Sequence, residues 1–195
     1  MSAWVALAEQ AAGCTACTEL AAARAHVVIG DYPPNARVLL VGEAPGAQED
    51  ATGRPFVGRA GQALDAALET VGLPRAEVAV LNILKCRPPG NRRPLAYEMT
   101  NCRGWLDRQI ALIDPAVIVG LGLTAVAGLW DGAATAKKSD LVLRALREQS
   151  LTANGYRFLA TYHPSGALRH GPNGTPMQAL RDDLARARAI AAEAG

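Results

Sequence analysis

The chain has 195 residues, 50% of them hydrophobic, and its 20 Lys and Arg nearly balance its 18 Asp and Glu. This length suits one domain over residues 1–195, and this hydrophobic content excludes an intrinsically disordered protein. The net charge of +2 is too small to indicate a nucleic-acid partner by itself. No apolar run is long enough to cross a bilayer, and the start, MSAWVALAEQ, lacks the basic residues of a secretory signal. We expect a cytoplasmic monomer without membrane contact.

Four short apolar runs recur along the chain, at residues 36–42, 78–84, 116–122 and 157–163. They show no clean alternation of apolar and polar residues, which is typical of strands buried on both faces of a parallel sheet. Stretches with helical spacing follow them, at residues 61–72, 95–113, 123–130 and 175–194. This order predicts an α/β fold, a three-layer αβα sandwich with a central four-stranded parallel sheet.

Each predicted strand ends in residues that suit neither a helix nor a strand. In chain order these endings are GEAPG, NILKCRPPGNRRP, GLG and HPSGALR. Open α/β sheets bind ligands at the carboxyl ends of their strands. Because four unusual endings converge on one edge of the predicted sheet, we expect the functional site at that edge.

The four cysteines lie in three separate segments. Cys14 and Cys17 form a Cys-x-x-Cys pair, and Cys86 and Cys102 follow much later. Buried free thiols and a redox dithiol are both possible, but a redox pair normally follows a strand, and no strand precedes this one. Zinc sites usually show two tight pairs, whereas the second pair here is spread over a loop and a helix. The pattern favours an iron–sulfur cluster over zinc.

The segment from Lys85 to Arg93, KCRPPGNRR, is basic and contains no acid. One interpretation is an ordinary solvated loop. The other is a loop that contacts phosphates, which requires clustered Lys and Arg. Charge alone does not separate these two interpretations.

Several motifs together resemble the family 4 uracil-DNA glycosylases. They are GEAPGAQED, GRPFVGRAG, LNILKCRPPGNRRP and HPSGALR, with the four cysteines at these spacings, and the match runs from Cys14 to the final helix. The resemblance implies a bacterial or archaeal hydrolase at the nucleoid that acts in base excision repair. It would bind uracil-containing DNA, single- or double-stranded, release uracil and leave an abasic site. It would also carry a [4Fe–4S] cluster on Cys14, Cys17, Cys86 and Cys102.

The resemblance implies that a flipped uracil is read by a few residues at the sheet edge. Phe56 would stack on the ring, and the segment of Gly42, Glu43 and Ala44 would contact its edge through the backbone. The Asn82 amide has a donor beside an acceptor, which matches uracil O4 and N3–H. A flipped amide would suit cytosine, so a neighbouring group must hold its orientation.

Two further roles concern the chemical step. His163 would donate a hydrogen bond to O2 of the departing uracil, where negative charge develops. Better-known uracil-DNA glycosylases of another family have an Asp one place after the position of Glu43, where this chain has Ala44. We therefore expect Glu49 to orient the water or stabilise the sugar cation. The catalytic set is then Glu49, His163 and Asn82, with Glu49 or the Ala44–Gly46 backbone excluding thymine.

DNA contacts would come from the loops around this pocket. The resemblance implies phosphate contacts by Lys85, Arg92, Arg93, Ser165 and Arg169. Leu168 would act as a wedge in the gap left by the flipped base. Gly166 stands where the family suggests a bulkier residue, which weakens the wedge assignment.

Three other functions explain the sequence less well. An iron–sulfur DNA-binding redox protein would explain the cysteines but not Phe56, Asn82 and His163. A uracil-DNA binding protein without turnover would need the histidine of an inserted basic loop, and this chain runs directly from KCRPPGNRRP into a helix. A nucleotide-binding protein is disfavoured because GEAPG lacks the phosphate-binding glycine patterns.

Overall fold

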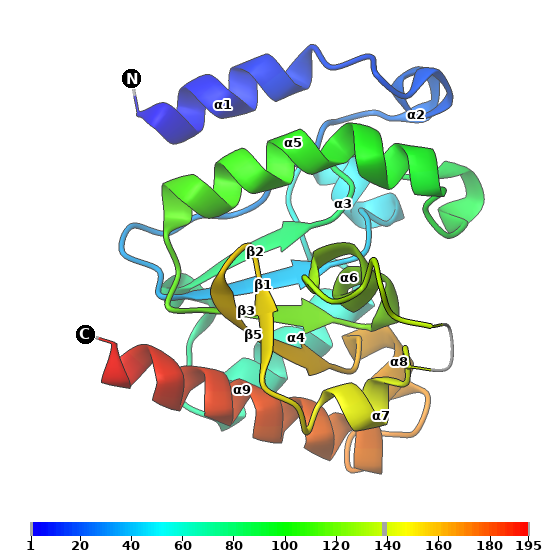
Figure 1. The fold of residues 1–195 in the computed structure, drawn as a ribbon. Helices are drawn as coiled ribbons and strands as arrows, with labels where there is room; N and C mark the ends of the chain where they lie inside the picture. Colours follow the sequence, from blue (N-terminus) through cyan, green and yellow to red (C-terminus); the bar gives the residue numbers. More distant parts are fainter. Residues whose placement is uncertain (1, 138–139, 195) are drawn as a thin grey trace.

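A five-stranded sheet runs through the centre of the computed structural model, which describes residues 2–137 and 140–194 (Figure 1). The strand order is β2-β1-β3-β5-β4. The strands are β1 (Val38–Gly42), β2 (Val78–Asn82), β3 (Val117–Leu121), β4 (Leu151–Ala153) and β5 (Tyr156–Thr161). β1, β2, β3 and β5 are parallel, and they coincide with the four predicted apolar runs. The predicted α/β class is therefore confirmed.

The predicted number of strands is wrong, because β4 pairs with β5 in an antiparallel hairpin. Asn154 and Gly155 form the turn and both have positive φ, at 51° and 80°. Asn-Gly is a strong hairpin signal, since both turn positions favour residues that tolerate positive φ. Three residues at a sheet edge carry too short an apolar run to stand out. The turn dipeptide was the available signal.

The helices occupy the segments between the strands and both ends of the chain. They are α1 (Ala3–Ala12), α2 (Thr18–Ala23), α3 (Ala47–Thr52), α4 (Arg59–Thr70), α5 (Ala96–Ile113), α6 (Leu123–Leu129), α7 (Leu143–Leu146), α8 (Pro164–Leu168) and α9 (Thr175–Glu193). Short 3₁₀ turns lie at Arg75–Glu77 and Pro89–Asn91. No helix in the described ranges has the length and apolar character needed to cross a membrane.

Both faces of the sheet are covered by helices, as Figure 1 shows with α5 above the sheet and α9 below it. Successive residues of a strand point to opposite faces. Leu39 and Val41 of β1 accordingly join a buried cluster with residues of α5 and α6. Val38 and Leu40 join a second cluster with residues of α4 and α9. A strand that serves both clusters must be apolar throughout, which explains the unbroken apolar runs.

The order of the strands reverses at β1. The chain passes from β1 to β2 on one side and then crosses back to β3 on the other side of β1. Such a reversal opens a crevice at the carboxyl ends of parallel strands. Gly42 and Asn82 end β1 and β2 in direct register.

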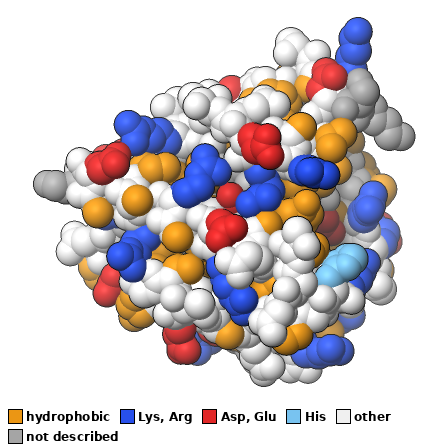
Figure 2. Space-filling view, turned by 90° about the horizontal axis from the view of Figure 1, so that it is seen from below, with side chains coloured by type: hydrophobic (Ala, Val, Ile, Leu, Met, Phe, Trp, Pro, Cys, Tyr) orange, Lys and Arg blue, Asp and Glu red, His pale blue; other side chains and the backbone are white. Residues whose placement is uncertain are grey.

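The surface charge is mixed where α9 covers the molecule. Figure 2 shows Lys and Arg side chains interspersed with Asp and Glu on this face, as the small net charge suggests. The Lys and Arg side chains do not gather into a single basic patch on the face that Figure 2 shows. Contacts with a polyanion are therefore better sought at the sheet edge.

Replacing Leu40 by Ala should lower the free energy of unfolding by about 2–5 kcal/mol, because the change opens a cavity beneath β1. Leu40 is fully buried in β1. Urea unfolding followed by circular dichroism measures the change. Leu112→Ala is the control, since Leu112 is 36% exposed and should lose far less. Equal losses in both variants would contradict this packing.

Candidate active site

A pocket at the carboxyl edge of the sheet brings together Phe56, Asn82 and His163. They come from the loop before α4, the end of β2 and the loop after β5. Glu49 of α3 also lines the pocket. A second hollow shares His163 and Ser165 with it and extends the site into a groove. The residues singled out for recognition therefore meet at one place.

Phe56 forms an apolar wall of this pocket. Its side chain is only 6% exposed, and the centre of its ring lies 5.8 Å from that of His163. Its φ angle is +52°, in the left-handed region that residues with a Cβ seldom occupy. The surrounding structure must stabilise this conformation.

Two glycines make room for Phe56 and Asn82. A Cβ on Gly42 would lie 2.5 Å from both Asn82 Oδ1 and Phe56 Cζ. A Cβ on Gly61 would collide with the carbonyl oxygen of Phe56. The glycines of GEAPG and GRAG are therefore needed for close approach of the pocket residues to the backbone.

Asn82 offers a polar group that no other described residue satisfies. The residue is 3% exposed, and its buried Oδ1 has no hydrogen-bond partner within the described ranges. Its backbone carbonyl accepts a hydrogen bond from Lys85 Nζ at 2.6 Å. A buried acceptor without a partner costs free energy, so this oxygen is suited to receive a donor from a ligand.

The hydrogen bonds of His163 define its tautomer. Nδ1 accepts a hydrogen bond from the Ser165 backbone N–H at 3.2 Å and lies 2.9 Å from Ser165 Oγ. The neutral ring therefore carries its proton on Nε2 and can donate from there. Burial lowers the pKa of His163, against smaller opposing effects of Glu43 and Glu49. The imidazole is thus a neutral donor at pH 7.

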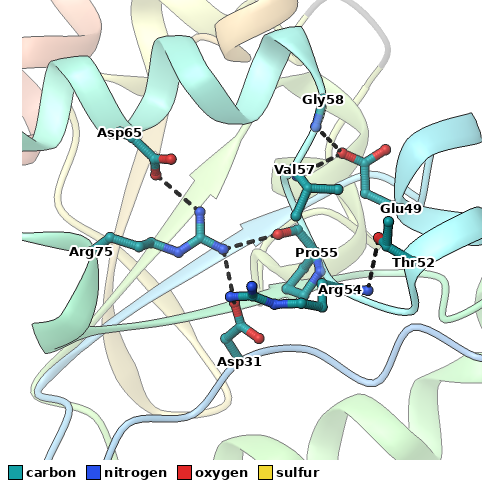
Figure 3. A network of polar contacts seen from close by, with 9 residues as sticks. All are labelled: Asp31, Glu49, Thr52, Arg54, Pro55, Val57, Gly58, Asp65 and Arg75. Carbon is teal, nitrogen blue, oxygen red and sulfur yellow. Dashed lines mark hydrogen bonds and ion pairs between the residues drawn. The ribbon is translucent and has the colours of Figure 1, made fainter.

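The Glu49 carboxylate accepts hydrogen bonds from two backbone segments that line the pocket. Its Oε1 accepts hydrogen bonds from Val57 N and Gly58 N, both at 2.9 Å (Figure 3). Its Oε2 accepts a third from Gly46 N at 3.1 Å. The carboxylate thus ties the start of α3 to the loop that carries Phe56. Sequence reasoning did not anticipate this tie.

The segment after β1 lies beside the pocket as well. Ala44 lines the pocket, and Glu43 lines the adjoining groove. The carbonyl oxygens of Gly42 and Glu43 accept hydrogen bonds from the backbone after β2, at 2.9 and 3.1 Å. These bonds fix the GEAPG segment against the end of β2.

All four cysteines line one cavity between the N-terminal segment, the loop after β2 and α5. Three donors approach their sulfurs: Arg24 Nη1 lies 3.3 Å from Cys86, Lys85 N 3.3 Å from Cys102, and Asn101 Nδ2 3.6 Å from Cys17. Within the described ranges, no group of three or more His, Cys, Asp or Glu side chains is placed to hold one metal ion. Leu84, Lys85 and Cys86, which follow the end of β2, also line this cavity.

Burial controls the charges around this cavity. It raises the pKa of Cys102 to about 11 and also raises that of Cys86. It lowers the pKa of Lys85 to about 8. A bound metal cation would instead lower the pKa of the cysteine thiols, because it binds them as thiolates. The donor set of four thiols, three of them with an N–H group at the sulfur, fits such a metal centre.

The prediction that Lys85 contacts DNA is wrong. Its side chain is 1% exposed and its ammonium bonds to the Asn82 carbonyl, so a phosphate cannot reach it. Arg92 does not present a free guanidinium either, because it bonds both oxygens of Glu98 and one of Glu19. It ties α2 to the start of α5. The basic run misled because the sequence does not reveal which of its cations are buried or paired.

The remaining candidates lie along the groove. Arg93, Ser165 and Arg169 are exposed and line its outer part. Leu168 is half-buried and packs against the core cluster on the α9 side. Two residues that sequence reasoning missed, Arg59 and Asn91, line the pocket itself. Both stand inside motifs already singled out, GRPFVGRAG and PPGNRR, which was the available signal.

Comparison with known proteins identifies relatives over most of the chain. The family model of the uracil DNA glycosylase superfamily matches residues 29–185. A Type-4 uracil-DNA glycosylase of Thermotoga maritima is 39% identical over 176 residues, 90% of this chain and 88% of that protein. One of Pyrobaculum aerophilum is 38% identical over 148 residues, 75% of each chain. A Type-5 enzyme of the same organism is 35% identical over 80% of this chain and 73% of its own.

The burial of His163 should make the protein less stable in mild acid. Its folded pKa lies below the ordinary value of 6.5, so the unfolded chain takes up the proton first as the pH falls. The free energy of unfolding should therefore decline below about pH 6.5, and His163→Gln should remove part of that decline. Urea unfolding at about pH 7.5 and about pH 5.5 measures it. An equal decline in both proteins would contradict the assignment.

Proposed function

This chain belongs to the uracil-DNA glycosylase superfamily, and from that membership we propose how its pocket carries out the reaction. The protein is a DNA glycosylase, a hydrolase that excises uracil from DNA in repair. The observation that carries the mechanism is the convergence of Phe56, Asn82 and His163 in one pocket at the sheet edge. Residues 1–195 act as one domain, since both buried clusters pack on the same sheet.

Recognition begins when uracil leaves the base stack, because its glycosidic bond cannot be reached inside a duplex. The Phe56 ring stacks on the flipped base. Asn82 Oδ1 accepts a hydrogen bond from uracil N3–H, and the amide nitrogen donates to O4. The partnerless state of Oδ1 supports this role. Gly42 allows Phe56 and Asn82 to contact the same base.

His163 acts on the leaving group. As the glycosidic bond breaks, negative charge develops on uracil O2, and the Nε2–H of His163 donates to that oxygen. The tautomer supports this role, since the Ser165 backbone N–H occupies Nδ1. A neutral donor aimed at charge that develops only in the transition state lowers the barrier without tightening substrate binding.

Glu49 orients the attacking water beside the sugar. Its Oε1 already accepts two backbone hydrogen bonds, whereas Oε2 accepts one and keeps a lone pair for water. A fixed carboxylate next to an oxocarbenium-like sugar also stabilises the positive charge there. The Ala44–Gly46 backbone beside Glu49 closes the space that the thymine methyl group would need.

The DNA strand follows the groove that leads away from the pocket. Arg93 and Arg169 hold phosphates, and Ser165 contributes a hydroxyl; their exposure in the groove supports these roles. Arg59, exposed at the pocket, joins them. Leu168 lies at the end of α8 beside this path and fills the gap left by the flipped base.

The cysteine cavity holds a [4Fe–4S] cluster. Cys14, Cys17, Cys86 and Cys102 are its ligands, supported by their position around one cavity and by the donors at their sulfurs. When bound, the cluster supplies a covalent cross-link among the N-terminal segment, the loop after β2 and α5. Its role is structural, and the excision step uses none of its redox chemistry.

Uracil excision tests the pocket. The wild-type protein at substoichiometric concentration should release uracil from an oligonucleotide over many turnovers and leave a thymine control intact. Asn82→Ala and His163→Ala should each be slower by about 10²–10³-fold, because each removes a hydrogen bond to the base. Alkaline cleavage of the abasic product, resolved on a gel, measures the rate.

His170→Ala is the matched control for the histidine, since His170 is exposed and outside the pocket, and it should keep the wild-type rate. Full rates in both pocket variants would refute the recognition scheme. A single stoichiometric burst without turnover would instead indicate a uracil-DNA binding protein.

Iron analysis tests the cysteine cavity. The purified wild-type protein should be brown and contain iron, and Cys102→Ala should lose most of both, because one of the four ligands is gone. Its thermal unfolding midpoint should also fall. Thr15→Ala, an exposed change between Cys14 and Cys17, is the control and should keep its iron. Zinc in place of iron in the wild type would contradict the cluster.

A further inference from the structure

The backbone of Phe56 needs support that its own sequence does not provide. A residue with a Cβ at φ +52° persists only where the surroundings over-determine it. The ring of this residue is also the stacking surface of the pocket. Whatever holds the Phe56 backbone therefore holds the base-stacking surface.

Two charged side chains hold the peptide groups on either side of Phe56 (Figure 3). Arg75 Nη2 donates to the Pro55 carbonyl oxygen at 2.9 Å. Glu49 Oε1 accepts from Val57 N at 2.9 Å. The Pro55 carbonyl belongs to the peptide group whose rotation sets φ of Phe56, and Val57 N–H to the one that sets ψ. Fixing both peptide groups fixes the backbone of Phe56.

Arg75 is itself oriented by two carboxylates. Its Nη1 bonds Asp65 Oδ1 of α4 at 3.1 Å, and its Nη2 bonds Asp31 Oδ2 at 3.1 Å. Asp31 is anchored to β2 by two backbone hydrogen bonds with Val80, at 3.0 and 2.9 Å. The guanidinium is therefore held by the sheet and by α4 before it reaches Pro55. Its planar guanidinium presents donors on two separate nitrogens in fixed directions, an arrangement that the compact ammonium of a lysine does not reproduce.

We propose that Arg75, oriented by Asp31 and Asp65, is a positioning residue that keeps Phe56 in place for stacking on the flipped base. The proposal rests on the proposed function of the pocket. Arg75 does not line the pocket and acts only through the Pro55 carbonyl. The alternative is an ordinary ion-pair network that stabilises the fold and has no effect on the position of Phe56.

Arg54 is a matched control in the same network. Figure 3 shows it beside Asp31, with Nη2 3.8 Å from Asp31 Oδ2. Its side chain is 71% exposed, against 24% for Arg75. Arg54→Gln removes the same charge as Arg75→Gln, close to the same aspartate. It leaves the hydrogen bond to the Pro55 carbonyl intact.

Nuclear magnetic resonance tests the proposal without any assay of activity. The chain has only two phenylalanines, so carbon-13 ring labelling gives separate signals for Phe56 and for Phe158 in the core. Arg75→Gln should shift or broaden the Phe56 signals and leave those of Phe158 unchanged. Arg54→Gln should change neither set. Unaltered Phe56 signals in Arg75→Gln would overturn the proposal.

A double-mutant cycle tests the same link through the rate of excision at saturating enzyme. Arg75→Gln should slow a single turnover by about ten- to hundredfold, since a small misplacement of a binding group has effects of that size. In a Phe56→Ala background, the same change should alter the rate by less than about twofold, because the group it positions is gone. An equal loss in both backgrounds would overturn the proposal.

Two further variants separate the remaining outcomes. Arg75→Lys keeps the charge and one hydrogen bond, so it should lie between the wild type and Arg75→Gln, and it replaces the latter if that variant does not fold. If the wild type and Arg54→Gln both fail to excise uracil, the proposed function is wrong. The Phe56 signals then still decide whether Arg75 holds this loop.

Discussion

The approach of Asn82 and Phe56 to the backbone of Gly42 is the contact on which the rest of the site depends. The two side chains come from separate elements and occupy the space that any Cβ on Gly42 would fill. The register of β1 and β2 sets Gly42 opposite Asn82, and the loop before α4 brings in the ring. The pocket is thus a consequence of strand pairing, with loops adding chemistry to a rigid edge.

The sequence was most informative where a residue must satisfy local chemistry and the sheet together. Strands that feed two buried clusters have to be apolar throughout, so β1, β2, β3 and β5 could be recognised. The edge strand β4 packs less and escaped notice. Asn82 and His163 could be singled out because polar groups are unusual at the ends of buried strands, and Phe56 because it stands in the motif GRPFVG.

Burial and pairing of charges could not be predicted in the same way. Lys85 and Arg93 stand in one basic run, yet one is enclosed beside the cysteine cavity and the other is exposed in the groove. Arg75 belongs to no motif, and its partners Asp31 and Asp65 lie on other segments of the chain. Glu49 also accepts three backbone hydrogen bonds, which the sequence did not indicate. Such roles follow from distances that only the folded chain defines.

Lys85 connects the pocket at the sheet edge with the cysteine cavity. Its backbone N–H meets the sulfur of Cys102, and its ammonium holds the carbonyl of Asn82. A displacement at the cysteine cavity is therefore transmitted through one residue, Lys85, to the backbone of Asn82. The end of β2 and the wall of the cysteine cavity therefore form one mechanical unit, in which neither part can shift without moving Lys85.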